Sequence, residues 1–189
     1  MNNKNDRLWG KFHEVYILLI GFGLTTLGGG LIAYFVQIRS WAYQNTQVQL
    51  QYDVKHAEDI LSDISCTLDN RIYRMRRIMW AYDYDLDKAE FEKYWEEYDI
   101  AKQNWNINID KNSQLLKLYF GKKAFDWYKC MIRPDLSVTD QMLIEIKRKF
   151  TWNLYKKLTD QINKNSKESN EFYVYLSNQI MYEKIGKFQ

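Results

Sequence analysis

The longest apolar stretch of the chain, residues 15–38, reads VYILLIGFGLTTLGGGLIAYFVQI and has no formal charge over 24 residues. A helix of this length extends about 36 Å at about 1.5 Å per residue, which exceeds a hydrocarbon core of about 30 Å. Aromatic residues flank it, as they do at membrane–water interfaces: Trp9, Phe12, Tyr16, Tyr34, Trp41 and Tyr43. The pattern predicts one N-terminal transmembrane helix in a single-pass chain.

A secretory signal peptide is the main alternative for this segment. Such peptides have a shorter apolar region that ends in a small-x-small cleavage site. Here the apolar run is long and leads into Gln37-Ile38-Arg39-Ser40-Trp41. The pattern therefore favours an anchor that is retained.

Beyond the anchor, apolar residues recur at steps of three and four, which is typical of a helix that buries one face. The members of this seam are Val54, Ala57, Leu61, Ile64, Leu68, Ile72, Met75, Met79 and Tyr82. Neither proline nor glycine occurs between Leu31 and Phe120. We expect the helix to continue directly from the membrane-spanning segment to about Tyr82.

Similar patterns predict further helices after Tyr82. A helix from Asp85 or Asp87 to about Asn108 would begin with the capping box Asp87-x-x-Glu90, and one over 113–132 would stop before Pro134. Either the pair Ser137-x-x-Asp140 or Thr139 would open a helix to about Lys164. The polar stretch 163–170 would form a turn, and a last helix would cover 171–186. The expected buried residues of the helices before Pro134 are Phe91, Trp95, Tyr98, Ala101, Trp105, Leu116, Phe120, Ala124, Trp127 and Met131. The last helix has Phe172, Tyr175, Leu176, Gln179 and Tyr182 at helical spacing, a face that would pack on the bundle or on a neighbouring subunit.

These patterns predict an all-α protein, in which one N-terminal transmembrane helix continues into a four- to five-helix bundle. The predicted parts are a tail (1–14), the transmembrane helix (15–38) and the bundle domain (39–189). The bundle has enough chain for one ordinary core. Its near-complete lack of Pro and Gly, with Pro134, Gly121 and Gly186 as the exceptions, supports the helical assignment.

Small residues occupy one face of the predicted membrane helix at intervals of four: Gly21, Thr25, Gly29 and Ala33. Such a face lets a second helix approach closely, and close packing drives helix association in lipid. Glycine is also simply tolerated in membrane helices, which is the plainer interpretation. We favour self-association, because a lone helix with such a face is most simply matched by copies of itself in a ring or dimer.

Glutamine-rich sequence follows the anchor between Ser40 and Tyr52. It contains Gln44, Asn45, Gln47, Gln49 and Gln51, of which Gln44, Gln47 and Gln51 are expected at the mouth of a pore. A polar helix next to a membrane span fits a stalk or the water-filled mouth of a pore.

Charge gives a weak signal for orientation in the membrane. Lys4, Arg7 and Lys11 precede the span, whereas Arg39 is the only basic residue that follows it before Lys55. By the positive-inside rule this would place the tail in the cytoplasm. Large domains can override so small a bias.

Charge also alternates along the predicted bundle, although the net charge is only +3. A basic group (Arg71, Arg74, Arg76, Arg77) precedes an acidic helix (Asp83, Asp85, Asp87, Glu90, Glu92, Glu96, Glu97, Asp99), which precedes a second basic group (Lys117, Lys122, Lys123, Lys129). The alternation favours antiparallel packing or docking between subunits. A solvated surface with ordinary ion pairs explains it equally well.

Little in the sequence supports catalysis or cofactor binding. The two histidines, His13 and His56, cannot form a metal cluster or a triad within one copy, and nucleotide-binding glycine motifs are absent. Cys66 and Cys130 have no ligand spacing and are expected to be buried structural thiols. We therefore expect no enzyme activity, metal or cofactor, and direct nucleic-acid binding has no support.

Small helical bundles of this size include one class of enzyme, the HEPN ribonucleases, which use an Arg-x4-6-His signature. The literal match, Arg7 to His13, precedes the membrane helix. The nearest match in the bundle, Arg148-Lys-Phe-Thr-Trp-Asn153, has asparagine where the histidine should be. Asparagine cannot transfer a proton near neutral pH, so nuclease chemistry is not expected.

With its lone glycine-rich helix, one compact helical domain and the degenerate RKFTWN, the chain resembles the small accessory membrane proteins of type VI-B CRISPR systems. The resemblance covers the whole layout and implies an HEPN-like domain. It further implies a ring-shaped pore in the bacterial inner membrane that strengthens antiphage defence beside an RNA-guided RNA nuclease. It places the bundle in the cytoplasm, against the weak charge signal.

The sequence thus supports two hypotheses about function. The first is a homo-oligomeric membrane pore whose partners are other copies, lipid and an RNA-guided RNA nuclease. The second is a membrane-tethered adaptor or sensor that binds a protein without conducting.

Overall fold

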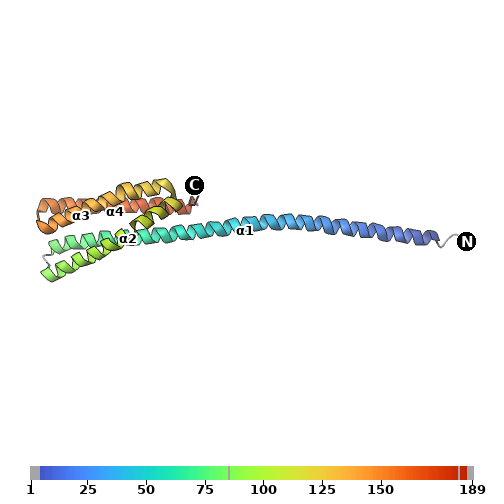
Figure 1. Ribbon diagram of the computed structural model, residues 1–189, viewed down its shortest axis with the longest axis horizontal. Helices are drawn as coiled ribbons and strands as arrows, with labels where there is room; N and C mark the ends of the chain where they lie inside the picture. Colours follow the sequence, from blue (N-terminus) through green and yellow to red (C-terminus); the bar gives the residue numbers. More distant parts are fainter. Residues whose placement is uncertain (1–4, 85, 183, 187–189) are drawn as a thin grey trace. The chain divides into compact units, whose positions relative to one another are not determined.

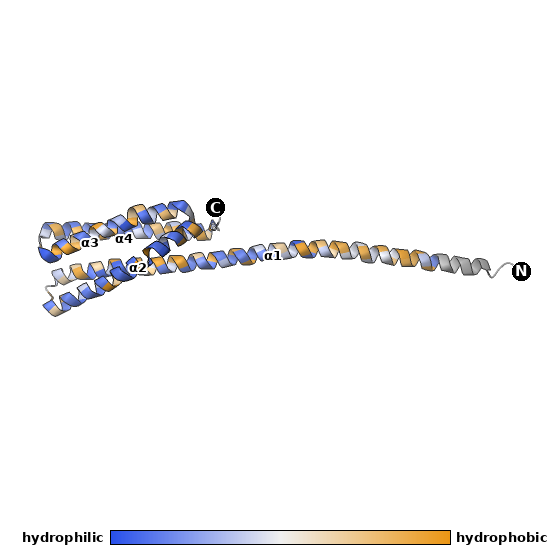
Figure 2. Cartoon of the chain, viewed as in Figure 1, coloured by the Kyte–Doolittle hydropathy of each residue, from blue (hydrophilic) through white to orange (hydrophobic). Residues whose placement is uncertain are grey.

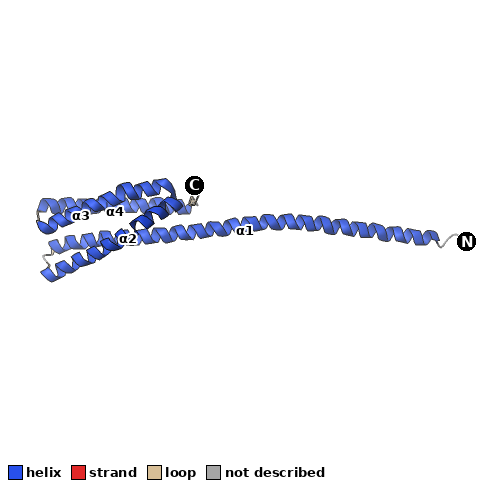
Figure 3. Ribbon diagram, in the orientation of Figure 1, coloured by secondary structure: helices blue, strands red, loops and turns tan. Residues whose placement is uncertain are grey.

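The computed structural model describes residues 5–84, 86–182 and 184–186, with side chains from Glu14 onward. The described chain is entirely helical apart from short turns (Figure 3). Its elements are α1 (Asn5–Asp83), α2 (Lys88–Trp127), the π-helix η1 (Tyr128–Ile132), α3 (Arg133–Arg148) and α4 (Trp152–Met181). The predicted all-α class is confirmed, and Figure 1 gives the order of the helices.

The long N-terminal helix α1 is uninterrupted over 79 residues, as the lack of Pro and Gly after Gly30 predicted. It begins at Asn5, inside the expected tail, and Trp9 and Phe12 lie outside the part whose side chains are described. The chain divides into two units, residues 1–49 and 50–189. The second unit is the helical bundle.

The bundle core is built on the predicted seam of α1. Ala57, Ile64, Leu68, Ile72, Met75 and Met79 are buried, and Val54, Leu61 and Tyr82 pack partly buried against them. Helix α2 runs antiparallel to this part of α1 (Figure 1) and contributes Trp95, Tyr98, Ala101 and Trp105, as predicted. Asp87 caps α2, because its side chain accepts a hydrogen bond from the backbone N–H of Glu90 at 2.8 Å.

The predicted end of the second helix near Asn108 is wrong. The helix continues through this polar stretch because its side chains bond to carbonyls of their own helix. Asn108 donates to the Asn104 carbonyl oxygen at 3.0 Å, and Ser113 donates to that of Ile109 at 2.7 Å. The actual break is at Gly121, whose φ of 80° and ψ of −177° are not helical.

Gly121 is buried and adopts a conformation that glycine alone enters readily. We expect Gly121→Ala to lower the free energy of unfolding by about 1–3 kcal/mol, because a Cβ is strained at this φ. Urea titration of the full chain measures the change. Lys122→Ala, at the next and exposed position, is the control; equal stability of the two variants would contradict the prediction.

The predicted stop before Pro134 is also wrong, because the chain passes through η1 directly into α3. Proline lacks an N–H and crowds the carbonyl four residues earlier. The wide π turn of residues 128–132 accommodates both, and the Arg133 N–H bonds to the Tyr128 carbonyl oxygen. The extra residue in this turn rotates the buried face. Tyr128 and Ile132 are buried, whereas Met131, predicted to be inside, is 48% exposed.

The predicted boundaries near the C-terminus are displaced as well. Ser137, Thr139 and Asp140 lie inside α3 instead of opening a helix, and the turn falls at Lys149–Thr151. Thr151 caps α4 by accepting from the Leu154 N–H at 3.2 Å. The stretch 163–170 is helical, since Asn165 and Ser169 are buried and bonded. Asn165 donates to Thr139 Oγ1 at 2.7 Å, and Ser169 donates to the Asn165 carbonyl oxygen at 2.7 Å.

Candidate functional site

The apolar band of α1 is the first candidate site, and Figure 2 shows it as a run of hydrophobic residues. By length and composition α1 is apolar enough to cross a membrane, and none of its most apolar window is buried. Exposed side chains include Leu18, Phe22, Leu24, Leu27 and Ile32, each 68–72% exposed. A core helix of a water-soluble protein would bury such residues. The apolar band is thus compatible with a single membrane span.

The small-residue face lies within this band and is open. Gly21, Thr25, Gly29 and Ala33 are exposed, and a Cβ added at Gly21 or Gly29 would meet no atom within 4 Å. Thr25 donates its hydroxyl hydrogen to the Gly21 carbonyl oxygen at 2.9 Å, and Thr26 donates to that of Phe22 at 2.7 Å. Because both hydroxyls are satisfied within the helix, the face can pack in lipid without leaving a donor unpaired.

The three glutamines of the expected pore mouth are accessible to different degrees. Gln44 and Gln51 are exposed, and Gln47 is partly exposed. Gln44 and Gln47 belong to the first unit of the chain, and Gln51 to the bundle. Their exposed amides can hydrogen-bond water.

Arg148 and Asn153, the degenerate HEPN-like positions, lie on different helices. Arg148 is the last residue of α3 and Asn153 is in the first turn of α4, and both side chains are exposed. The turn Lys149–Thr151 separates them. Within the described residues, neither side chain forms a hydrogen bond or an ion pair.

A buried polar cluster, which no sequence pattern predicted, lies where α1, α2 and α3 meet. Arg71 Nη2 lies 2.9 and 2.8 Å from the two carboxylate oxygens of Asp140, and the Lys102 Nζ lies 3.1 Å from Asp140 Oδ2. Tyr98 donates its hydroxyl hydrogen to the same carboxylate. The Arg71 side chain is 3% exposed, and its guanidinium carbon lies 5.8 Å from the ring centre of Trp105. One carboxylate thus links three helices.

The sequence indicates this cluster only by charged residues that lie among apolar residues at helical spacing. Arg71 falls between Leu68 and Met75 of the seam, and Asp140 falls between Leu136 and Leu143. Charges at such positions are rarely buried unless they are paired. The expected pair Ser137-x-x-Asp140 at a helix start gives Asp140 a local role and does not indicate its pairing with Arg71.

Burial and the neighbouring Asp140 charge raise the pKa of Tyr98 well above its ordinary value, so the phenol remains a neutral donor. Burial raises the pKa values of Tyr128 and Tyr173 in the same direction. The cluster holds no nucleophile with an adjacent proton acceptor free to activate it. Its chemistry is that of a structural ion pair.

These pKa shifts predict alkaline sensitivity. Above about pH 10 an unfolded tyrosine ionises while buried Tyr98 stays neutral, so stability present below pH 10 is lost as the pH rises. We expect Tyr98 to contribute a loss of about 1.4 kcal/mol per pH unit above that point. Urea titrations across pH 9 to 11 should show a shallower loss in Tyr98→Phe. Tyr84→Phe, at an exposed position, should keep the wild-type slope; an unchanged slope in Tyr98→Phe would contradict the assignment.

The antiparallel packing of oppositely charged helices, which the alternation of charge favours, is found where α1 meets α2. Arg74 and Arg77 of α1 both pair with Glu97 of α2. The second basic group behaves differently, since Lys122 pairs with Asp126 one turn along the same helix. The acidic helix thus pairs with the first basic group in the described structure.

The expectation of buried cysteines is wrong, because Cys66 and Cys130 are both exposed. Cys66 lies between Ile64 and Leu68 but off the buried face, and Cys130 lies in the π turn between buried Tyr128 and Ile132. Among the described residues, no group of three His, Cys, Asp or Glu side chains is placed to hold a metal ion.

Comparisons with protein-family models, with curated proteins and with solved structures found no match to this chain.

Proposed function

We propose that this chain forms a homo-oligomeric pore in the bacterial inner membrane. It would act as a non-enzymatic accessory effector that strengthens RNA-targeting CRISPR defence by permeabilising or depolarising that membrane. The observation that carries the proposal is the exposed apolar band of α1 with its open face of small residues. The association with an RNA-guided RNA nuclease rests on the resemblance of layout alone.

In this mechanism several copies bring residues 15–38 around a common axis. The faces of Gly21, Thr25, Gly29 and Ala33 pack against neighbouring helices, and lipid covers the larger side chains. An axis lined by uncharged residues can be closed by dewetting and opened by a small widening. Gln44, Gln47 and Gln51 would supply polar groups where the pore meets water. The bundle would lie in the cytoplasm, where the nuclease acts.

Conduction is the test of this function. Purified chain in proteoliposomes should release a trapped dye, and leucine at Gln44, Gln47 and Gln51 together should reduce release about tenfold, because the mouth becomes harder to wet. Asn104→Leu, at an exposed polar position of α2, is the matched control. The assay is repeated with the candidate nuclease and its target RNA. An intact oligomer that never leaks in either condition would rule out the pore.

A membrane-tethered adaptor is the second candidate, and one observation favours it. Ile100, Ile107 and Leu118 of α2 are 53%, 78% and 59% exposed. Apolar side chains on one exposed helix suggest contact with another protein. The mass of the particle in detergent separates the two functions, since an adaptor can be a monomer and a pore cannot.

A further inference from the structure

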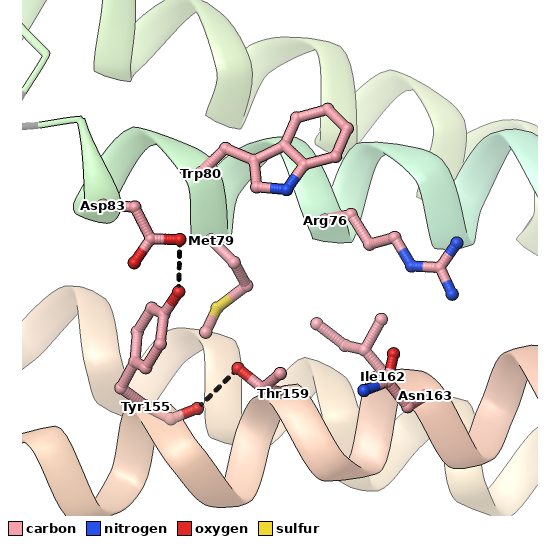
Figure 4. A pocket seen from close by; sticks show the side chains of 8 residues that line it. All are labelled: Arg76, Met79, Trp80, Asp83, Tyr155, Thr159, Ile162 and Asn163. Carbon is pink, nitrogen blue, oxygen red and sulfur yellow. Dashed lines mark hydrogen bonds between the residues drawn. The ribbon is translucent and has the colours of Figure 1, made fainter.

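A pocket of about 190 Å³ opens between the end of α1 and the start of α4, within the bundle. Figure 4 shows its arrangement: Asp83 and Tyr155 lie at one end, Arg76 lies at the other, and Met79 and Ile162 lie between them. Trp80 also lines the pocket, and Figure 4 shows its indole on the side of α1 that faces away from α4. The pocket is separate from the small-residue face and from the buried Arg71–Asp140 pair.

The acidic end of the pocket is held in one orientation. Tyr155 donates its hydroxyl hydrogen to Asp83 Oδ2 at 2.5 Å, which leaves the other carboxylate oxygen able to accept. Burial, and then the hydrogen bond to Asp83, raise the pKa of Tyr155 to about 12, so the phenol stays a donor at neutral pH. This end is suited to a ligand group that donates hydrogen bonds.

The basic end is a guanidinium without a partner. Arg76 is partly buried, and within the described residues it has no ion pair, hydrogen bond or ring contact. Its neighbours in the same basic group are all paired: Arg71 with Asp140, and Arg74 and Arg77 with Glu97. A guanidinium in this setting is suited to a phosphate, which it can bind through two parallel hydrogen bonds.

Apolar and aromatic side chains lie between the two ends. Trp80 is 45% exposed, and its ring packs edge-on against Tyr73 at 6.2 Å, which orients it. Met79 is buried and Ile162 is 1% exposed, so the floor of the pocket is apolar. An exposed indole that lines such a pocket offers a stacking surface to a flat ring.

Spacing selects among ligands with these features. Asp83 and Arg76 are seven residues apart on one helix, or about 10 Å at about 1.5 Å per residue. The α-ammonium and α-carboxylate of a free amino acid are on one carbon, so these two groups cannot reach both ends. A fatty acid has no donor for Asp83 and does not use the aromatic surface of Trp80. A nucleotide places an amine, a flat ring and a phosphate in this order.

We propose that this pocket binds a nucleotide whose base carries an exocyclic amine. The amine would donate to Asp83, the base would stack on Trp80, and the phosphate would pair with Arg76. Adenine, cytosine and guanine have such an amine, and uracil does not. The nucleotide can be free or be one unit of an RNA strand, because both present the same three groups.

Calorimetric titration of the full chain in detergent compares AMP, UMP and adenosine. We expect AMP to bind at least about tenfold more tightly than UMP, which leaves Asp83 without its donor, and than adenosine, which leaves Arg76 without its anion. Binding of all three with the same measurable affinity would overturn the proposal. This comparison uses the unmodified protein, so it does not depend on how any variant folds.

Variants then locate the site. Arg76→Gln and Trp80→Leu should each weaken AMP binding about tenfold. The matched control is Arg148→Gln, which removes an exposed arginine outside the pocket lining. AMP binding that is unaffected by Arg76→Gln and Trp80→Leu would overturn the proposal.

A short oligoadenylate RNA distinguishes the two sources of the nucleotide. Binding of the strand but not of AMP, with loss in Arg76→Gln, would support the pocket and identify a strand as its ligand. Tighter binding of AMP would identify the free nucleotide. Failure of both probes to bind at millimolar concentration would overturn the proposal, and it would leave the pore untouched because that function is tested by leakage.

Discussion

Asp140→Ala is expected to lower the free energy of unfolding of the bundle by about 3–5 kcal/mol. The substitution leaves the Arg71 charge, 3% exposed, without its carboxylate, and it also removes the acceptor of Tyr98 and Lys102. An unpaired charge in such a site costs more than the pair contributed. Urea titration followed by far-ultraviolet circular dichroism of the full chain measures the loss.

A double variant shows whether charge or shape is responsible. Arg71→Met with Asp140→Leu replaces the pair by apolar groups, and it should recover most of the stability that Asp140→Ala loses. Asp126→Ala removes the partner of Lys122 on the exposed surface and should leave the unfolding midpoint unchanged. If the double variant is as unstable as Asp140→Ala, packing and not the unpaired charge accounts for the loss.

Gly29→Leu should break the oligomer into smaller particles, with Gly21→Leu and Ala33→Leu acting in the same direction. A leucine on the small face keeps neighbouring helices apart and removes the contacts of close approach, so we expect association to weaken at least about tenfold. A Cβ at Gly21 or Gly29 meets nothing within 4 Å in the single chain, and leucine is a better helix former than glycine. Loss of mass would thus report on assembly and not on folding of α1.

Light scattering measures the mass of each variant's particle in detergent. Leu19→Ala is the control, because Leu19 is 64% exposed on the same helix and is not part of the small face. Unchanged mass in all three leucine variants would mean that any association lies in the bundle alone. Exposed Ile100, Ile107 and Leu118 would then be the first positions to alter.

Much of the fold followed from local patterns that do not depend on neighbours. The seam from Val54 to Tyr82 and the stripe from Trp95 to Trp105 were predicted because helical spacing alone selects the buried face. Asp87 was recognised as a cap because its role involves only the next three residues. The apolar band of residues 15–38 was equally plain, since length and lack of charge define it.

Helix boundaries were predicted less well, because polar residues and proline were interpreted by their average preferences. Asn108, Ser113, Asn165 and Ser169 favour turns in isolation. In the bundle their side chains bond to helix carbonyls or to Thr139, so the helices continue. The π turn at residues 128–132 admits Pro134 and shifts burial from Met131 to Tyr128 and Ile132.

The sequence by itself determined an all-α chain, its long apolar N-terminal helix and the buried faces of residues 54–82 and 95–105, since these depend on spacing along one helix. Only the tertiary structure decided which charges are buried together and where the helices break. Arg71 and Asp140 are 69 residues apart, and Arg76 and Tyr155 belong to helices at opposite ends of the bundle sequence. The spacing of residues along one helix does not predict such contacts, because they form only when separate helices pack on one core.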